Sequence, residues 1–308
     1  MLQRSVVLKR DFLTVLDLSA EEIARLLKRS IALKSGADSN ACPLIGRSIG
    51  LLFEKSSTRT RVSLEIGIYQ LGAQSIYMNA KEIQIGRGET IHDTAKVLSR
   101  YLDAIIIRTY SHDVLAEFAS ESSIPVINGL SDLHHPCQAL ADMMTIIEKK
   151  GSLKGRRLAY VGDGNNVAHS LIEAAASTGM DITVACPKGY EPDKSIIDRV
   201  RKMSKSEITV TSDPQDAVKD ADAVYTDVWV SMGQEKEAAQ KKKKFGKYQL
   251  NKKLLSYAKK DAIVLHCMPA HRGEEITAEV FDGPMSVVFD QAENRLHTQK
   301  ALLEFLLS

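Results

Sequence analysis

Hydroxyl and guanidinium side chains gather at residues 57–61, which read Ser-Thr-Arg-Thr-Arg. They follow an apolar run at 48–53 and precede a helical pattern of apolar residues at 62–71. A turn that leads from a strand into a helix presents backbone N–H groups that have no partner inside the helix, and the helix dipole favours a negative charge there. Arginine adds a planar fork of donors that matches phosphate oxygens. This pattern predicts that the turn holds a phosphate group.

Two further polar residues stand where the first half of the chain changes element. Arg108 follows three isoleucines at 105–107, at the end of a predicted strand. It is either a cap that turns the chain into water or a residue of the ligand crevice beyond a parallel strand, and we favour the second. His135, in His-His-Pro-Cys-Gln at 134–138, is either a plain cap or a functional residue, and the sequence shows no companion ligands at the spacing of a metal site. Gln84 lies in a glycine-flanked loop that by itself indicates only a loop.

The stretch 160–167, Tyr-Val-Gly-Asp-Gly-Asn-Asn-Val, is similar to a dinucleotide-binding turn but matches it poorly. Val167 occupies the third glycine position, and the next strand ends near Lys188 without an acidic residue for a ribose. A nucleotide-binding oxidoreductase is therefore disfavoured. The glycines are expected to serve the tight turn, from which Asn165 and Asn166 project.

Three more candidates follow in the second half. Asp227 ends one predicted strand, and a turn or helix cap is the commoner role of such an aspartate. Cys267 ends another, in His-Cys-Met-Pro at 266–269, where a buried cysteine would by default be inert packing. Arg295 begins the last predicted helix and alone indicates only a surface residue. None of the three carries a function without its context.

Short strand-like runs alternate with helical patterns along the chain. Strands are expected at 49–53, 75–78, 104–108, 125–127, 157–161, 182–185, 208–211, 223–226, 263–266 and 287–289. Helices are expected at 20–34, 61–71, 90–101, 114–120, 135–149, 166–177, 195–202, 214–219, 252–259 and 291–307. This alternation predicts an α/β fold with parallel sheets covered on both faces. The polar segment 149–152 divides it into two doubly wound domains, 1–150 and 151–290, and the expected place for a two-substrate site is the cleft between them.

Composition sets the class of protein. The chain has 308 residues and a net charge of +2, so no global basic field indicates nucleic acid. Four scattered cysteines indicate neither a zinc site nor a disulfide framework and favour a reducing cytoplasm. Neither a targeting segment nor a membrane span is expected. The lysine run at 241–244 is interpreted as a solvated loop or helix face, with nucleic-acid or membrane attraction as the alternative.

Taken in order, these segments closely resemble the aspartate/ornithine carbamoyltransferase family over almost the whole chain. The matching residues are 57–61, Gln84, Arg108, 135–138, Asn166, Asp227, Ser-Met-Gly at 231–233, 266–269 and Arg295. The resemblance implies a carbamoyl-phosphate domain at 1–150, a second-substrate domain at 151–290, and a C-terminal helix at 291–308 that returns to the first. It also implies trimers, with Gln84 acting across a subunit interface. Met268 departs from the family, which often has Leu there, but this position is expected to act through its backbone.

The resemblance implies transfer of a carbamoyl group from carbamoyl phosphate to the side-chain amine of L-ornithine, as in arginine biosynthesis or a urea-cycle-type step, without metal or cofactor. The residues implied for carbamoyl phosphate are Ser57, Thr58, Arg59, Thr60, Gln84, Arg108, His135, Gln138, Cys267, Met268 and Arg295. Those implied for ornithine are Asn166, Asp227, Ser231 and Met232. Catalytic roles are implied for Arg108, His135, Asp227 and Cys267. The loop at 230–247 is expected to close over ornithine.

Other functions stay open at this point. A sister transferase would use acetylornithine, putrescine or aspartate, and Asp227 with Ser-Met-Gly favours ornithine because these groups suit a free α-amino acid. A non-catalytic regulator on the same scaffold is a further alternative. Intact Arg59, Arg108, His135 and Cys267 weigh against it.

Overall fold

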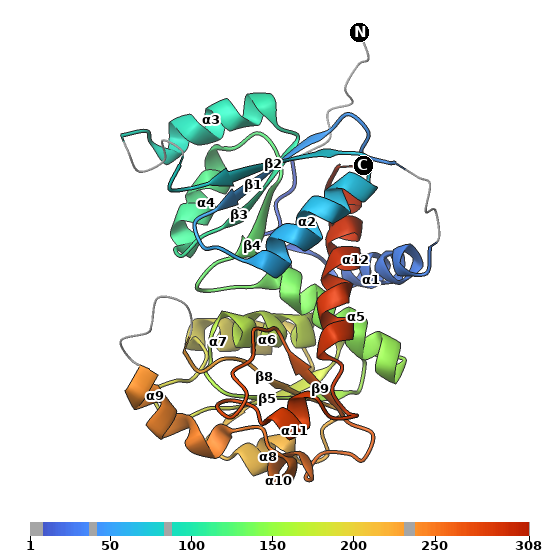
Figure 1. Cartoon of the computed structure of the whole chain (residues 1–308), viewed down its shortest axis with the longest axis vertical. Helices are drawn as coiled ribbons and strands as arrows, with labels where there is room; N and C mark the ends of the chain where they lie inside the picture. Colours follow the sequence, from blue (N-terminus) through green and yellow to red (C-terminus); the bar gives the residue numbers. More distant parts are fainter. Residues whose placement is uncertain (1–8, 37–41, 83–87, 231–237, 308) are drawn as a thin grey trace. The chain divides into compact units, whose positions relative to one another are not determined.

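The computed structural model describes residues 9–36, 42–82, 88–230 and 238–307. By its contacts the chain forms two compact units, Met1–Cys137 with Arg295–Ser308, and Gln138–Asn294. Each unit contains one parallel sheet with helices (Figure 1), so the predicted α/β class with two parallel-sheet domains is confirmed. The domain bounds of 1–150 and 151–290 stay a prediction.

The first unit is built on a four-stranded sheet in the order β2-β1-β3-β4. Its strands are β1 (Ser48–Phe53), β2 (Gln74–Asn79), β3 (Ala104–Arg108) and β4 (Val126–Leu130), and every pair is parallel. The chain moves outward from β1 in one direction to β2 and in the other to β3 and β4. The carboxyl ends of β1 and β3 therefore flank a topological switch point, which is where open α/β sheets bind ligands.

Helices cover both faces of this sheet. One buried cluster joins it to α3 (Ile91–Tyr101) and α4 (His112–Glu121), with Leu52, Ile105, Ile107, Leu115 and Phe118 among its members. On the opposite side, α2 (Thr58–Gln70) lies along α12 (Val288–Leu307) (Figure 1). The two helices approach closely, because a Cβ atom added at Gly67 would lie 3.3 Å from the Leu296 side chain. The C-terminal helix thus packs on the first unit, as the family resemblance implies.

Two further helical elements precede β1. The 3-10 helix η1 spans Val15–Asp17, and α1 spans Ala20–Lys34. The Ser19 backbone N–H donates to Glu22 at 2.8 Å, and the Glu22 backbone N–H donates to the Ser19 hydroxyl at 3.3 Å. This capping box starts α1 where the sequence predicts a helix from 20 to 34.

The second unit has a five-stranded parallel sheet in the order β7-β6-β5-β8-β9. Its strands are β5 (Arg157–Val161), β6 (Asp181–Ala185), β7 (Ile208–Thr211), β8 (Ala223–Thr226) and β9 (Ile263–His266). The chain again moves outward in both directions from its first strand. The switch point therefore lies between the carboxyl ends of β5 and β8.

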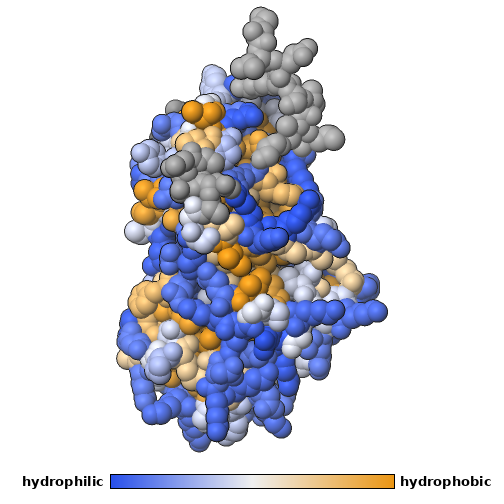
Figure 2. All heavy atoms as spheres, turned by 90° about the vertical axis from the view of Figure 1, so that its right-hand side faces the viewer, coloured by the Kyte–Doolittle hydropathy of each residue, from blue (hydrophilic) through white to orange (hydrophobic). Residues whose placement is uncertain are grey.

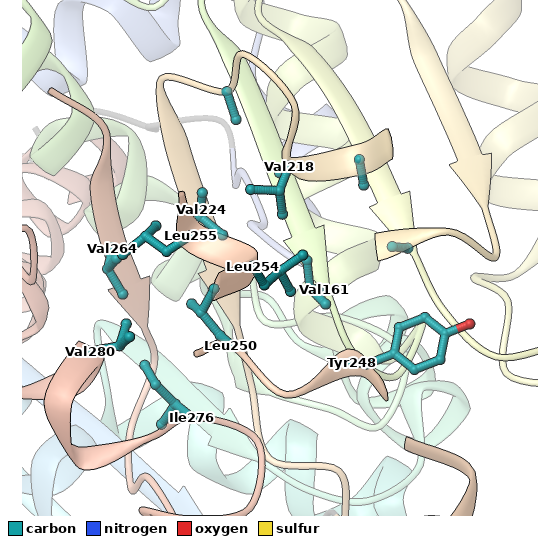
Figure 3. Packing of buried hydrophobic residues seen from close by; sticks show 14 of the residues in the cluster. Val161, Val218, Val224, Tyr248, Leu250, Leu254, Leu255, Val264, Ile276 and Val280 are labelled. Atoms are coloured by element: carbon teal, nitrogen blue, oxygen red, sulfur yellow. The ribbon is translucent and has the colours of Figure 1, made fainter. Parts of the chain in front are cut away.

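Short helices pack on one face of the second sheet. This core joins β5, β8 and β9 to α8 (Pro214–Val218), α10 (Lys252–Leu255), α11 (Ala278–Phe281) and the 3-10 helix η3 (Gly246–Tyr248). Figure 3 shows Val218, Leu254 and Leu255 beside the strand residues Val161 and Val224, with Tyr248 at the margin of the cluster. The longer helices of the unit are α5 (Pro136–Lys150), α6 (Asn166–Thr178) and α7 (Lys194–Met203), together with α9 (Ala238–Phe245). Val161 and Val224 are fully buried, as expected for central strands of a covered parallel sheet.

Three predicted elements differ from the structure. The predicted strand at 287–289 is wrong, because Val288 and Phe289 already belong to α12 and only the Val287 N–H bonds to the sheet, at the Val264 carbonyl. A short apolar run does not distinguish a strand from the start of a buried helix. The predicted helix at 252–259 ends at Leu255. The predicted loop at 230–247 contains α9 from Ala238 onward.

The lysine run at 241–244 is only partly solvated. Lys242, Lys243 and Lys244 are exposed, but Lys241 is 2% exposed, so the interpretation of the whole run as a solvated face is wrong for this residue. Figure 2 shows one face of the chain, where hydrophilic residues predominate and hydrophobic ones gather in separate patches. Among the described residues, no helix is long and apolar enough to cross a membrane.

Candidate active site

The motif at 57–61 forms the start of α2. Ser57 is the N-cap, and its hydroxyl accepts from the Thr60 backbone N–H at 3.4 Å and donates to the Thr60 hydroxyl at 3.0 Å. The helix begins at Thr58, so Thr58, Arg59 and Thr60 lie in its first turn, three residues earlier than the predicted start. The first N–H groups of the helix remain outside its ladder, which favours an anion at this end. Arg59 is half-buried and makes no hydrogen bond or ion pair with any described residue.

Two buried arginines stand beside this helix start. Arg108 is the last residue of β3, aligned with Phe53 of β1, and the β3–β4 register shifts between Ile107 and Arg108. Such an irregularity redirects a side chain at the end of a strand. Arg295 comes from α12, and its Nη2 donates to the Thr60 hydroxyl at 2.8 Å. The switch point of the first sheet therefore carries fixed positive charge.

His135 follows β4 and immediately precedes α5, and it is buried. Burial, and then the positive charges of Arg295, Arg108 and Lys55, hold its pKa well below 6.5. The ring is therefore neutral near pH 7, and it offers one N–H donor without adding charge. We call Arg59, Thr60, Arg108, His135 and Arg295 the cationic site.

Lys55 lies just before the motif and is also buried. It forms an ion pair with Asp132, and its Nζ lies 4.1 Å from the centre of the Tyr110 ring. This residue was missed by sequence reasoning, although it stands two positions before Ser57 in the same turn. It adds a further positive charge near His135.

The switch point of the second unit carries an acid instead. Asp227 follows β8, is 5% exposed and accepts three hydrogen bonds, each at 2.8 Å. Its Oδ1 accepts from the Val228 N–H and the Cys267 thiol, and its Oδ2 accepts from Asn165 Nδ2. Donors on both oxygens fix the orientation of the carboxylate. We call Asn165, Asp227 and Cys267 the carboxylate site.

Asn165 is held so that its amide cannot turn over. Its Oδ1 accepts from the backbone N–H groups of Val167 at 3.0 Å and Ala168 at 3.3 Å, which caps α6, and from the Tyr160 hydroxyl at 3.2 Å. With the oxygen committed to three donors, the NH₂ group must face Asp227. The sequence assigns Asn166 to the substrate and gives Asn165 no role beyond the turn.

His266 fixes the backbone beyond β9. Its Nδ1 accepts from the Met268 N–H at 2.9 Å, so the ring proton lies on Nε2, which faces Glu275 Oε1 at 3.2 Å. Both His266 and Glu275 are buried. Met268 has a φ of 55°, a conformation uncommon for a residue with a side chain, and the bond to His266 supports it. The backbone N–H of Met268 is thus engaged, which leaves its carbonyl for contact with a ligand.

Gln138 belongs to a separate buried network in the second unit. Its Nε2 donates to Asp142 Oδ1 at 2.8 Å, one turn along α5, and Gln291 Nε2 donates to the same oxygen at 2.7 Å. Gln291 also donates to the Tyr225 hydroxyl at 3.1 Å. Gln138 is therefore fixed in orientation by the carboxylate behind it.

Ligand atoms of Asp227, His266 and Cys267 lie within 4.8 Å of one another, a spacing that could hold a metal ion. Each of these groups is already hydrogen-bonded within the unit, His266 to Glu275 and Cys267 to Asp227. The arrangement is equally suited to passing a proton between the thiol and the carboxylate.

The comparisons with known proteins agree over nearly the full length. Residues 10–148 match the family model for the carbamoyl-P binding domain of aspartate/ornithine carbamoyltransferase, and residues 154–306 match its Asp/Orn binding domain. The ornithine carbamoyltransferase of Syntrophus aciditrophicus is 53% identical over 302 residues, covering 97% of this chain and 100% of that protein. That of Halalkalibacterium halodurans is 55% identical, covering 97% and 95%. The solved structure of ornithine carbamoyltransferase from Pyrococcus furiosus matches with a TM-score of 0.92 at 51% identity, covering 97% of each chain.

This chain belongs to the aspartate/ornithine carbamoyltransferase family. Within that family framework, the first unit brings together Ser57, Thr58, Arg59, Thr60, Arg108, His135 and Arg295. The second brings Cys267 to Asp227 and also contains Asn166, Met268 and Gln138. Gln84, Ser231 and Met232 lie outside the described residues. The substrate roles of all these residues stay predictions.

Proposed function

We propose that this chain transfers the carbamoyl group of carbamoyl phosphate to the side-chain amine of L-ornithine, giving L-citrulline and phosphate. The observation that carries this proposal is the presence, in a chain of this family, of a cationic site at one switch point and a hydrogen-bonded carboxylate–thiol pair at the other. The relatives named ornithine carbamoyltransferase favour ornithine over acetylornithine, putrescine and aspartate as acceptor.

At the cationic site we propose that carbamoyl phosphate binds through its phosphate. The first N–H groups of α2, the Thr60 hydroxyl and Arg59 suit the phosphate oxygens, and each such charge-assisted contact is worth roughly 1.5–3 kcal/mol. Arg108 and the neutral His135 are candidate donors to the carbonyl oxygen as negative charge grows on it. Arg295, already bonded to Thr60, would stabilise the departing phosphate.

At the carboxylate site we propose that ornithine binds and loses a proton. The free amine has a pKa near that of lysine, ~10.4, so at neutral pH it must be deprotonated before it attacks. Asp227 would pair with a cationic amino group, while Cys267 would take part in moving the proton. Asn166, Ser231 and Met232 are proposed for the α-amino and α-carboxylate groups. The amine nitrogen then bonds to the carbamoyl carbon and the bond from that carbon to the phosphate oxygen breaks. The departing phosphate takes the remaining surplus proton of the amine and leaves as hydrogen phosphate.

The test is an assay with radiolabelled carbamoyl phosphate and four acceptors: ornithine, acetylornithine, putrescine and aspartate. We expect ornithine to exceed the others by orders of magnitude in kcat/KM. An acetylated α-amine loses its charge and leaves a polar site poorly paired, and putrescine leaves the carboxylate-binding groups empty. Comparable turnover of acetylornithine or putrescine would indicate a sister carbamoyltransferase that uses that acceptor instead of ornithine.

We further propose a homotrimer, with Gln84 reaching a neighbouring subunit. In support, Val62, Ile66 and Tyr69 form an exposed apolar stripe on α2, and their side chains are 44–76% exposed in the single chain. Light scattering should give about three times the chain mass of 34.0 kDa. Replacing Tyr69 with Glu should shift this mass toward that of the monomer. A mass of 34.0 kDa for the parent protein itself would contradict the proposal.

We also propose a cytoplasmic setting and a role in arginine biosynthesis. All four cysteines are free thiols, and Cys137 and Cys186 are buried. Burial raises the pKa of each of these two thiols to about 12, which keeps them protonated and unreactive. Complementation of a strain that cannot make citrulline from ornithine would test this role, and failure despite good expression would contradict it.

A further inference from the structure

A buried ion pair lies beside the carboxylate site. The Nζ of Lys241, on α9, is 2.5 Å from Oδ2 of Asp163, in the turn after β5. Both side chains are largely withdrawn from water, at 3% and 12% exposure, whereas the next three lysines of the same run are exposed. A lysine in an otherwise solvated run is buried only where a partner compensates its desolvation. Asp163 supplies that compensation here.

The turn that carries Asp163 also carries Asn165, and it cannot shift easily. Between them, Gly164 approaches the backbone of 190–192 so closely that an added Cβ would lie 2.3 Å from the Pro192 nitrogen. The Gly164 N–H also donates to the Tyr190 carbonyl at 2.9 Å. Asp163 therefore has a fixed place relative to Asn165, whose amide bonds to Asp227.

The negative charges of Asp163 and Asp227 both act on the hydroxyl of Tyr160. After burial, the negative charges of Asp227 and then Asp163 raise the pKa of Tyr160 well above 10. The residue before Asp163 is also close to Asp227, because a Cβ added at Gly162 would lie 3.8 Å from the Asp227 carbonyl oxygen. This edge of the sheet thus carries two carboxylates, and Lys241 places one positive charge against that of Asp163. Removing Lys241 would make the edge more negative by one unit charge.

We propose that Lys241, by neutralising Asp163, sets the charge of the carboxylate site and so selects an amino-acid acceptor over a diamine. This inference rests on the proposed function. Ornithine brings two ammonium groups and one carboxylate, and therefore one net positive charge, which one uncompensated aspartate matches. Putrescine brings two positive charges and no carboxylate, and it would match two aspartates. Lys241 is thus a specificity-determining residue that acts through Asp163 rather than by touching the reacting atoms.

The neighbouring lysines do not duplicate this role. The Nζ of Lys244 lies 4.9 Å from the centre of the Tyr190 ring, and Lys242 pairs with Glu274, but both side chains are exposed and screened by water. Lys243 is exposed as well and makes no ion pair with a described residue. Lys243 is therefore the matched control for Lys241.

The experiment compares two competitive inhibitors of ornithine in steady-state assays. Putrescine carries two positive charges, and 5-aminovalerate carries one positive and one negative charge. In Lys241→Met we expect the inhibition constant of putrescine to fall roughly tenfold and that of 5-aminovalerate to rise, since an unscreened unit charge at short range is worth a factor of about ten or more. Lys243→Met should match the parent protein for both inhibitors.

The double variant Asp163→Asn, Lys241→Met separates charge from packing. It removes both members of the pair, which is tolerated far better than leaving one buried charge alone, and it returns the site to a single uncompensated aspartate. We expect it to restore the parent ratio of the two inhibition constants. Thermal melting and carbamoyl phosphate affinity of each variant report on folding.

Two results would overturn the inference. One is a weakening of both inhibitors together in Lys241→Met, which indicates loss of structure rather than of charge. The other is a double variant that keeps the altered ratio. A parent protein that makes no citrulline from ornithine would instead refute the proposed function, and this inference with it.

Discussion

The two units place opposite chemistry at the same position of similar sheets. In both, parallel strands spread in two directions from the first strand, and a candidate residue, Arg108 in one and Asp227 in the other, lies at the end of a strand that flanks the switch point. In the first unit these side chains are cations, with Arg108 beside the start of α2. In the second they are acceptors and a thiol, with Asp227 receiving three donors.

This difference shows how one scaffold serves two substrates. The topology determines where a ligand binds, whereas the residue at each strand end determines which charge it must carry. In the cationic site burial, and then the arginines and Lys55, hold the pKa of His135 well below 6.5, so its ring can donate a hydrogen bond without adding charge. In the carboxylate site the three donors around Asp227 hold its carboxylate in one orientation, which suits a cationic amine.

The largest effect is expected from Arg108→Gln. This change removes a buried guanidinium from the proposed carbonyl contact while keeping a polar side chain of similar reach. We expect kcat/KM for carbamoyl phosphate to fall about 10²–10³-fold, as for loss of an oxyanion donor. Steady-state kinetics with Arg25→Gln, an exposed arginine on α1, provide the control. A loss of less than about threefold in kcat/KM would mean that Arg108 does not contact the reacting carbonyl group.

Asp227→Asn should affect the other substrate. The amide has the shape of the carboxylate but cannot neutralise an ammonium group, so kcat/KM for ornithine should fall on the order of 10²-fold. The affinity for carbamoyl phosphate, measured in the absence of ornithine, should stay unchanged. Asp198→Asn, at an exposed position of α7, serves as control. Equal losses toward both substrates would contradict the division between the two sites.

Asn165→Ser should give a smaller and more specific change. Serine can still cap α6, but it cannot donate to Asp227 at the position of Asn165 Nδ2. We expect about a tenfold loss in kcat/KM for ornithine, because one hydrogen bond to a charged group is lost. The affinity for carbamoyl phosphate should stay that of the parent protein, because Asn165 lies in the second unit.

Asn251→Ser is the matched control for this change, because Asn251 caps α10 in the same way without contacting Asp227. It should leave kcat/KM for ornithine where it is in the parent protein. An equal loss of activity in Asn165→Ser and Asn251→Ser would mean that Asn165 acts only on stability.

The smallest effect concerns the pH dependence of His135. Its pKa in the folded chain lies well below 6.5, so the folded ring stays neutral while an unfolded chain would take up a proton near pH 6.5. Its contribution to stability is therefore complete above pH 6.5 and is lost as pH falls toward the lowered value. A proton NMR titration, with the signal assigned by its absence in His135→Gln, should show no midpoint between pH 6 and 8. A midpoint near 6.5 would contradict the burial of the ring beside these cations.

Much of this arrangement could be predicted from the sequence, because strand ends in a parallel sheet meet at one edge. Arg108, Asp227 and Cys267 each follow an apolar run, and their positions along the chain place them at that edge. The capping box of α1 and the proline at the start of α5 are local sequence signals, and both helices begin in the structure where these signals predict. The order of the family motifs then indicated which substrates to consider.

The remaining features depend on packing, which a linear pattern does not contain. Lys241 stands in a run of four lysines, and only the fold brings Asp163 to it across 78 positions. Asn165 and Asn166 are adjacent and chemically identical, so the sequence could not tell which one faces Asp227. Val288 and Phe289 are typical of a strand, yet they begin α12 because the backbone bonds to β9 end at Val287.

The division of labour is tested most directly by calorimetric titration of carbamoyl phosphate into Arg59→Ala and Asp227→Asn. Arg59 is half-buried in the first turn of α2 and makes no hydrogen bond or ion pair with a described residue, so its loss should leave the fold intact. We expect affinity to fall by about one to two factors of ten in Arg59→Ala, as for removal of a charge-assisted contact, and to match the parent protein in Asp227→Asn. Unchanged affinity in a folded Arg59→Ala protein, or an equal loss in both variants, would contradict the assignment of the anion to the first unit.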